Sequence, residues 1–85
     1  MNAHIKYLET FYGKIVAKYQ KEAKDERGLW KDDRGLVVNI YHMLLEAYRE
    51  LETVESSSIK VAFDKYAEDR QKEMDEIIRR FEKND

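Results

Sequence analysis

The sequence predicts an all-α fold, an antiparallel up-down-up three-helix bundle that forms a single helical domain over residues 1–85. Proline is absent and glycine occurs only three times, so little interrupts helices. Apolar residues recur at three- and four-residue spacing in three segments, which is the period of a helix face. The connectors between these segments are short, and short connectors favour antiparallel neighbours. A helical hairpin that dimerises through its third helix is the alternative architecture.

The first helix is expected at residues 3–27. Its apolar stripe consists of Ile5, Leu8, Tyr12, Ile15 and Tyr19. Steps of three and four residues place these side chains on one face, at coiled-coil-like spacing. Gly28 follows, at a position where a left-handed residue commonly ends a helix.

The second helix is expected at residues 33–55, with Asp32 or Asp33 as its N-cap. Its apolar stripe is Val37, Tyr41, Leu44, Tyr48 and Leu51, and further apolar residues widen the stripe past half of the circumference. A helix with so wide an apolar arc is expected to lie centrally and to pack on two sides.

The third helix is expected at residues 58–83, after a run of serines that can cap it. Its apolar stripe is Ile59, Phe63, Tyr66, Met74, Ile77 and Phe81. Opposite charges at four-residue spacing mark its outer face as solvated. Arg70 interrupts the stripe near its centre. We expect its stem to pack on Tyr66 and Met74 and its head to meet a tyrosine or a carboxylate.

Composition excludes several classes of protein. Cysteine is absent, so disulfide-stapled modules and thiolate zinc sites are excluded. Charges near the N-terminus break up any signal-peptide core, and no apolar run approaches the roughly 20 residues of a membrane span. We therefore expect a cytoplasmic protein without a membrane partner. The net charge of -2 makes nucleic acid an unlikely ligand.

Catalytic chemistry has little support in the sequence. There is no cysteine nucleophile, and no phosphate-binding or dinucleotide motif occurs. His42, Glu46 and Glu50 share a helix face but lack the Glu-x-x-His order of di-iron bundles. Magnesium-dependent all-α nucleotide pyrophosphohydrolases carry a Glu-Glu-x-x-Glu run, which the spacing of Glu73 and Glu76 does not reproduce. The sequence thus predicts a non-enzyme with no catalytic, cofactor-binding or metal-ligating residues and no cofactor.

Candidate partner-binding residues fall in three places. They are Trp30 with its neighbours Arg27 and Arg34, the acidic end of the second helix with Glu46, Glu50 and Arg49, and Arg70. Trp30 is interpreted either as a lid over the core or as an interface anchor. The acidic end is either neutralised within the chain by Lys6, Lys60 and Lys65 or free to contact a basic partner. Residues 24–30 and 31–37 form a seven-residue repeat, KDERGLW and KDDRGLV, around the candidate tryptophan.

These observations predict a small non-enzymatic protein-binding module of bacterial or phage type. It would act as an adaptor or inhibitor that regulates another protein, such as a replication factor, a transcription factor or a toxin. The identity of that protein cannot be derived from the sequence, and a homodimer is compatible with it. A nucleic-acid-binding three-helix protein is one alternative, although acids interleave the basic residues of the third helix. The other alternative is the magnesium-dependent pyrophosphohydrolase.

Overall fold

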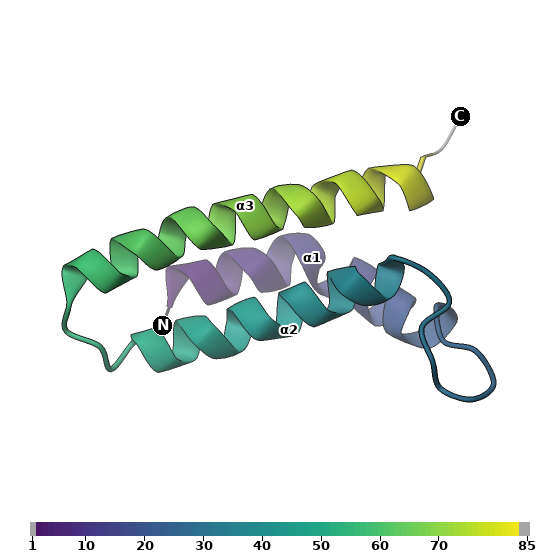
Figure 1. Ribbon diagram of the computed structural model, residues 1–85, viewed down its shortest axis with the longest axis horizontal. Helices are drawn as coiled ribbons and strands as arrows, with labels where there is room; N and C mark the ends of the chain where they lie inside the picture. Colours follow the sequence, from purple (N-terminus) through teal and green to yellow (C-terminus); the bar gives the residue numbers. More distant parts are fainter. Residues whose placement is uncertain (1, 84–85) are drawn as a thin grey trace.

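The computed structural model describes residues 2–83 and contains three α-helices. They are α1 (Ala3–Glu22), α2 (Arg34–Leu51) and α3 (Ser57–Phe81), and no β-sheet forms within the described range (Figure 1). The prediction of an all-helical fold with three helices is confirmed.

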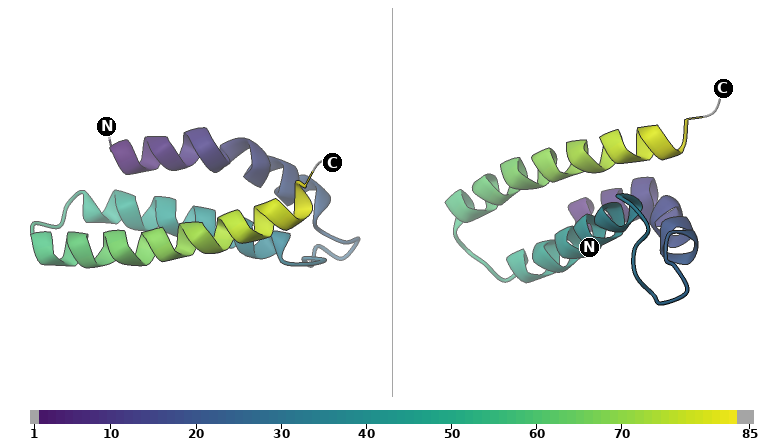
Figure 2. Two further views of the ribbon diagram at one scale, coloured as in Figure 1. Left: turned by 90° about the horizontal axis from the view of Figure 1, so that it is seen from above. Right: turned by 45° about the vertical axis from the view of Figure 1, so that its right-hand side comes forward.

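The helices lie side by side along the long axis of a molecule that measures 43 × 30 × 20 Å (Figures 1 and 2). The start of α1 meets the end of α2, where Asn2 Nδ2 donates to the carbonyl oxygen of Tyr48 at 3.3 Å. The start of α2 meets the end of α3, where Arg80 Nη2 donates to Asp33 Oδ2 at 3.2 Å. The backbone of α2 packs against both α1 and α3, so α2 holds the molecule together.

The core is built mainly on α2. This helix contributes eight buried residues, against four from α1 and three from α3. The buried hydrophobic side chains of the helices are Leu8, Tyr12, Val16, Tyr19, Val37, Val38, Ile40, Tyr41, Leu44, Leu45, Tyr48, Ala67, Met74 and Ile77. The apolar arc of α2 is wide enough to face two neighbours at once, and this explains its central position.

Side chains, rather than close backbone approach, connect α1 to α3. The Tyr12 hydroxyl donates to Asp75 at 2.8 Å, and the Tyr19 hydroxyl donates to Glu82 at 3.0 Å. Lys18 also reaches Glu82, at 2.8 Å. Burial and the adjacent carboxylate raise the pKa of Tyr12, so its hydroxyl remains a donor at neutral pH. A long tyrosine side chain spans the gap between α1 and α3 and still satisfies its polar end.

The predicted end of the first helix was wrong. The helix stops at Glu22, five residues before the expected position, and Gly28 lies in a turn beyond it. Asp25 Oδ1 accepts hydrogen bonds from the backbone N–H groups of Arg27 and Leu29, at 2.9 and 3.0 Å. An aspartate that bonds nearby backbone in this way offers the chain an alternative to the helix. Gly28 does adopt the left-handed conformation, with φ of 81°, but as part of this turn.

The other boundaries also differ from those predicted. The second helix runs from Arg34 to Leu51 and stops four residues before the expected end. Asp33 occupies its N-cap position but makes no side-chain cap bond, whereas Asp32 Oδ1 accepts the N–H of Arg34 at 3.0 Å. The third helix is capped by Ser56, whose hydroxyl accepts the N–H of Ile59 at 3.4 Å, in line with the expected serine cap.

Candidate protein-binding surface

Four side chains of α2 and α3 are only partly covered: Met43 and Ala47 of α2, and Tyr66 and Arg70 of α3. The two from α2 line a depression together with Glu46 and Glu50, and we call it the α2 depression. Met43 and Ala47 are half-buried, and the side chain of Tyr66 is 46% exposed. The prediction that Tyr66 belongs to the core stripe was therefore wrong. Tyr66 lies at the edge of the core and faces solvent.

Contacts of neighbouring residues fix the positions of these four side chains along the long axis of the molecule. The rings of Tyr48 and Phe63 lie 5.1 Å apart, and the Arg34 guanidinium lies 4.9 Å from the ring centre of Phe81. Between these two points, residue numbers on α2 fall as those on α3 rise. Met43 is therefore level with Arg70, and Ala47 lies one turn further along.

The α2 depression has an acidic rim. A depression of about 410 Å³ is lined by Met43, Glu46, Ala47 and Glu50. Glu46 and Glu50 are exposed, and among residues 2–83 neither has a cationic group within 4.0 Å. Both lie in the second half of α2, where the helix dipole adds negative potential. The depression therefore combines apolar walls with a negative rim.

Direct pairing of Glu46 or Glu50 with the three lysines considered does not occur among residues 2–83. Lys65 pairs with Asp69 of its own helix at 4.0 Å, and Lys60 lines a pocket at the end of the bundle together with Glu52. No ion pair of the described chain joins Lys6 to these glutamates.

Arg70 on α3 has a ring and a carboxylate beside its head, as expected for it. Its guanidinium carbon lies 5.5 Å from the ring centre of Tyr66, and its Nη1 lies 2.6 Å from Oε1 of Glu73. Arg70 Nε is shielded from solvent and has no hydrogen-bond partner among residues 2–83.

Trp30, Arg27 and Arg34 do not line the α2 depression. Trp30 is half-buried, and its ring packs so tightly on Gly35 that a methyl group there would overlap it. Lys24 Nζ covers the ring at 4.7 Å from its centre. These contacts favour the interpretation of Trp30 as a lid over the loop end of the core.

The two arginines beside Trp30 are paired locally. Arg34 forms a two-bond fork with Asp32, with Nε–Oδ1 at 2.8 Å and Nη2–Oδ2 at 2.7 Å. This hydrogen-bonded pair lowers the pKa of Asp32 to about 2. Arg27 is exposed and lies 3.7 Å from Asp25. Arg49, the remaining candidate, is exposed. It lies about 160° around α2 from Ala47, outside the α2 depression.

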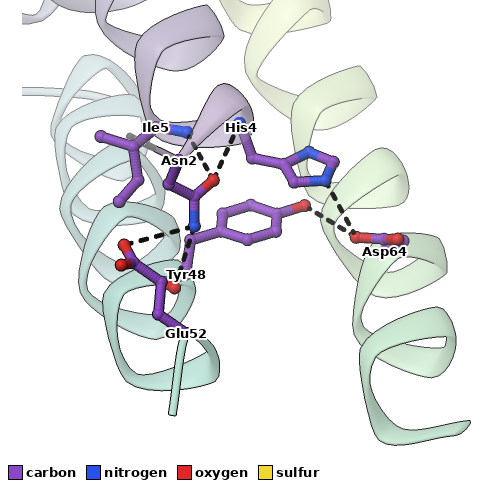
Figure 3. Close-up of polar contacts among 6 residues, drawn as sticks. All are labelled: Asn2, His4, Ile5, Tyr48, Glu52 and Asp64. Carbon is purple, nitrogen blue, oxygen red and sulfur yellow. Dashed lines mark hydrogen bonds and ion pairs between the residues drawn. The ribbon is translucent and has the colours of Figure 1, made fainter. Parts of the chain in front are cut away.

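A second depression, of about 270 Å³, lies where the start of α1 meets α2 and α3 (Figure 3). Asn2 caps α1 by accepting the N–H groups of His4 and Ile5, at 2.9 and 3.3 Å. The His4 ring stacks on Tyr48 at 4.5 Å, and Asp64 Oδ1 accepts the Tyr48 hydroxyl at 3.4 Å. Burial raises the pKa of Tyr48 to about 12. Figure 3 shows these groups converging from three helices. Their contacts connect the helix ends.

Residues that sequence reasoning did not select complete the surface. Met43, Ala47 and Tyr66 are not among the candidate partner-binding residues of the sequence. Met43 and Ala47 belong to the apolar residues that widen the stripe of the second helix, and the width of that stripe was the available signal.

A separate aromatic pair is exposed on α1. The rings of Tyr7 and Phe11 lie 4.5 Å apart, and the side chains are 48% and 65% exposed. The pair therefore forms an exposed aromatic patch on α1.

Comparisons with known proteins found no matching family model, no matching curated protein and no matching solved structure. Within residues 2–83, no group of three or more His, Cys, Asp or Glu side chains is arranged to hold a metal ion. None of the three helices is long and apolar enough to cross a bilayer.

Proposed function

We propose that this chain is an antiparallel up-down-up bundle that works as a small non-enzymatic protein-binding module in the cytoplasm. Its function would be that of an adaptor or inhibitor that occupies a surface of another protein. The observation that carries the proposal is the α2 depression, a half-exposed apolar hollow whose two rim glutamates form no ion pair within the described residues.

Two kinds of partly exposed residue support protein binding. Tyr and Arg are enriched among the residues that dominate binding energy, and methionine adapts its shape to different apolar partners. Met43 lines the α2 depression, and Tyr66 and Arg70 contact each other on α3. Rigid helices carry all of these residues, so little order has to be gained on binding.

Affinity capture is the direct test. The full chain is immobilised as bait, and the control bait carries Ala47→Arg, which fills the depression with a charged side chain. We expect one protein to be retained near equimolar amount by the natural chain and to be lost from the control. Mass spectrometry and quantitative staining measure both.

Two further assays would overturn the proposal in favour of its alternatives. Tight binding of duplex DNA at about 50 mM salt would indicate a nucleic-acid-binding protein. Magnesium-dependent release of pyrophosphate from a nucleoside triphosphate would indicate an enzyme. Retention of no protein above background by the natural bait would also contradict the proposal.

A further inference from the structure

We infer that the first turns of α3, residues 57–65, form a lid that opens while the rest of the bundle stays folded. The lid includes the connector at residues 52–56, and we call the whole segment, residues 52–65, the α3 lid. When it unwinds and lifts, it enlarges the depression of about 270 Å³ at this end of the bundle and exposes Tyr48 and Leu51. Opening is a property of this chain whether or not the α2 depression binds a partner.

Burial is divided unevenly along α3. All buried residues of this helix, Ala67, Met74 and Ile77, lie beyond the lid. None of residues 57–65 is buried, and Ile59 and Val61 are 53% and 68% exposed. Most of the stability of a helix in a protein comes from packing of its apolar face, which has to offset the entropy of ordering the chain. The first turns of α3 are therefore held less firmly than the rest.

Within residues 2–83, the hydrogen bonds that join α3 to α1 all lie beyond the lid. Asp75 accepts the Tyr12 hydroxyl at 2.8 Å. Glu82, at the C-cap of α3, accepts hydrogen bonds from the Tyr19 hydroxyl and from Lys18 Nζ, at 3.0 and 2.8 Å. These contacts hold residues 67–82 on the bundle when the lid has lifted.

The lid is attached mainly through one residue of α2, Tyr48. The Phe63 ring meets the Tyr48 ring nearly at right angles, with the ring centres 5.1 Å apart. The Tyr48 hydroxyl donates to Asp64 at 3.4 Å, which is longer than most hydrogen bonds between oxygens. His4 Nε2 lies 3.8 Å from Asp64, but both side chains are more than half exposed, so this pair contributes little.

The two connectors of the bundle differ in the same sense. In the first connector, the N–H of Lys31 donates to the carbonyl oxygen of Ala23 at 2.8 Å, and Trp30 packs on Gly35. In the second connector, the N–H groups of residues 52–54 donate to carbonyl oxygens three residues earlier, in the last turn of α2. Within residues 2–83 its backbone bonds only to the adjacent turns of α2 and α3, so it does not hold the lid closed.

The position of the lid gives its opening a consequence for binding. The lid lines the depression with Lys60 and Asp64. Figure 3 shows the Asp64 carboxylate facing Tyr48 and His4. When Asp64 moves away, the Tyr48 hydroxyl loses its acceptor and the ring becomes accessible beside Leu51. Lids of binding sites are drawn from the least stable parts of a fold, and burial and bonding place this segment among them.

Native-state hydrogen exchange of the full chain, measured by NMR at each amide, tests the lid. The informative amides are those of residues 61–65 and 71–78, which all lie inside α3. After correction for intrinsic rates, we expect the first group to exchange about tenfold faster or more, because it opens without the second. Urea below the unfolding transition should accelerate residues 71–78 more than residues 61–65, because global unfolding exposes more surface than lid opening.

Two tyrosine-to-phenylalanine variants separate lid opening from global unfolding. Tyr12→Phe removes a hydrogen bond that stays intact when the lid opens, so it should accelerate residues 71–78 about five- to thirtyfold and leave residues 61–65 unchanged. Tyr48→Phe removes a hydrogen bond that both kinds of opening break, so it should accelerate both groups about two- to tenfold. Tyr66→Phe changes a side chain that is 46% exposed and is the control, which should alter neither group.

Three results would overturn the inference. They are equal protection of residues 61–65 and 71–78, acceleration of both groups alike by Tyr12→Phe, and unchanged exchange of residues 61–65 in Tyr48→Phe. Each would show that α3 opens only with the whole bundle or that Tyr48 does not hold the lid. Capture of a partner through the α2 depression is measured separately, so the proposed function can stand when the lid fails and the reverse.

Discussion

Two glycines of the helices differ in the space around them, and this difference predicts opposite effects of the same substitution. An added methyl group at Gly13 of α1 would lie 3.6 Å from the Tyr41 hydroxyl oxygen, an ordinary contact. An added methyl group at Gly35, in the first turn of α2, would lie 2.8 Å from Trp30 Cβ and closer still to the indole ring. Gly13→Ala should therefore stabilise the fold, whereas Gly35→Ala should destabilise it.

The expected magnitudes follow from helix propensity and overpacking. Alanine is favoured over glycine in a helix interior by about 0.8–1.0 kcal/mol, so Gly13→Ala should raise the free energy of unfolding by roughly that amount. Gly35→Ala gains at most the same, but the overlap with Trp30 costs about 1–3 kcal/mol. The overlap includes Cβ of Trp30, which side-chain rotation does not move. We therefore expect a net loss of about 1–2 kcal/mol.

Urea denaturation followed by circular dichroism measures both changes, and a double variant tests their cause. In a Trp30→Gly background, which removes the indole ring and its Cβ, the methyl group at residue 35 has room, so the loss from Gly35→Ala should disappear or reverse. This non-additivity is the signature of direct contact. If Gly35→Ala stabilises the natural chain as Gly13→Ala does, Trp30 does not pack on α2 and its interpretation as a lid is wrong.

Three further predictions concern polar groups. Tyr12→Phe removes the hydroxyl that donates to an α3 carboxylate at 2.8 Å, so the free energy of unfolding in urea should fall by about 1–2 kcal/mol, with Tyr7→Phe as the silent exposed control. The hydrogen bond from Arg34 lowers the pKa of Asp32 from 3.8 to about 2, so its stabilising contribution is complete above pH 3.8 and is lost as the pH falls towards 2; an acid-denaturation series should lose this component in Asp32→Asn. Arg70→Leu should keep thermal stability within about 0.5 kcal/mol or raise it, because an apolar side chain can replace a partly buried charge; strong destabilisation would contradict the position of α3.

Periodicity predicted the three helices correctly, because each apolar stripe has to be buried and only a helix brings its members to one face. The end of α1 could not be predicted from that pattern. It depends on the side chain of Asp25, which captures two backbone N–H groups that a longer helix would have used. Such a local competition leaves no periodic signal in the sequence.

The seven-residue repeat shows the same limit. Gly28 and Gly35 occupy equivalent positions in KDERGLW and KDDRGLV. In the structure Gly28 supplies a left-handed turn with φ of 81°, whereas Gly35 is a helical residue that lets Trp30 approach α2. Equivalent sequence thus serves two different requirements for glycine, and tertiary packing decides which one applies.

The α2 depression follows from the width of the apolar arc of α2. The buried core takes eight residues from α2 and, within the described range, only Ala67, Met74 and Ile77 from α3. Met43 and Ala47 lie at the edge of the arc and remain half-buried. The width of the arc thus accounts both for the central position of α2 and for an apolar strip left over beside Glu46 and Glu50. Under the proposed function, this strip is the part of the chain that a partner would cover.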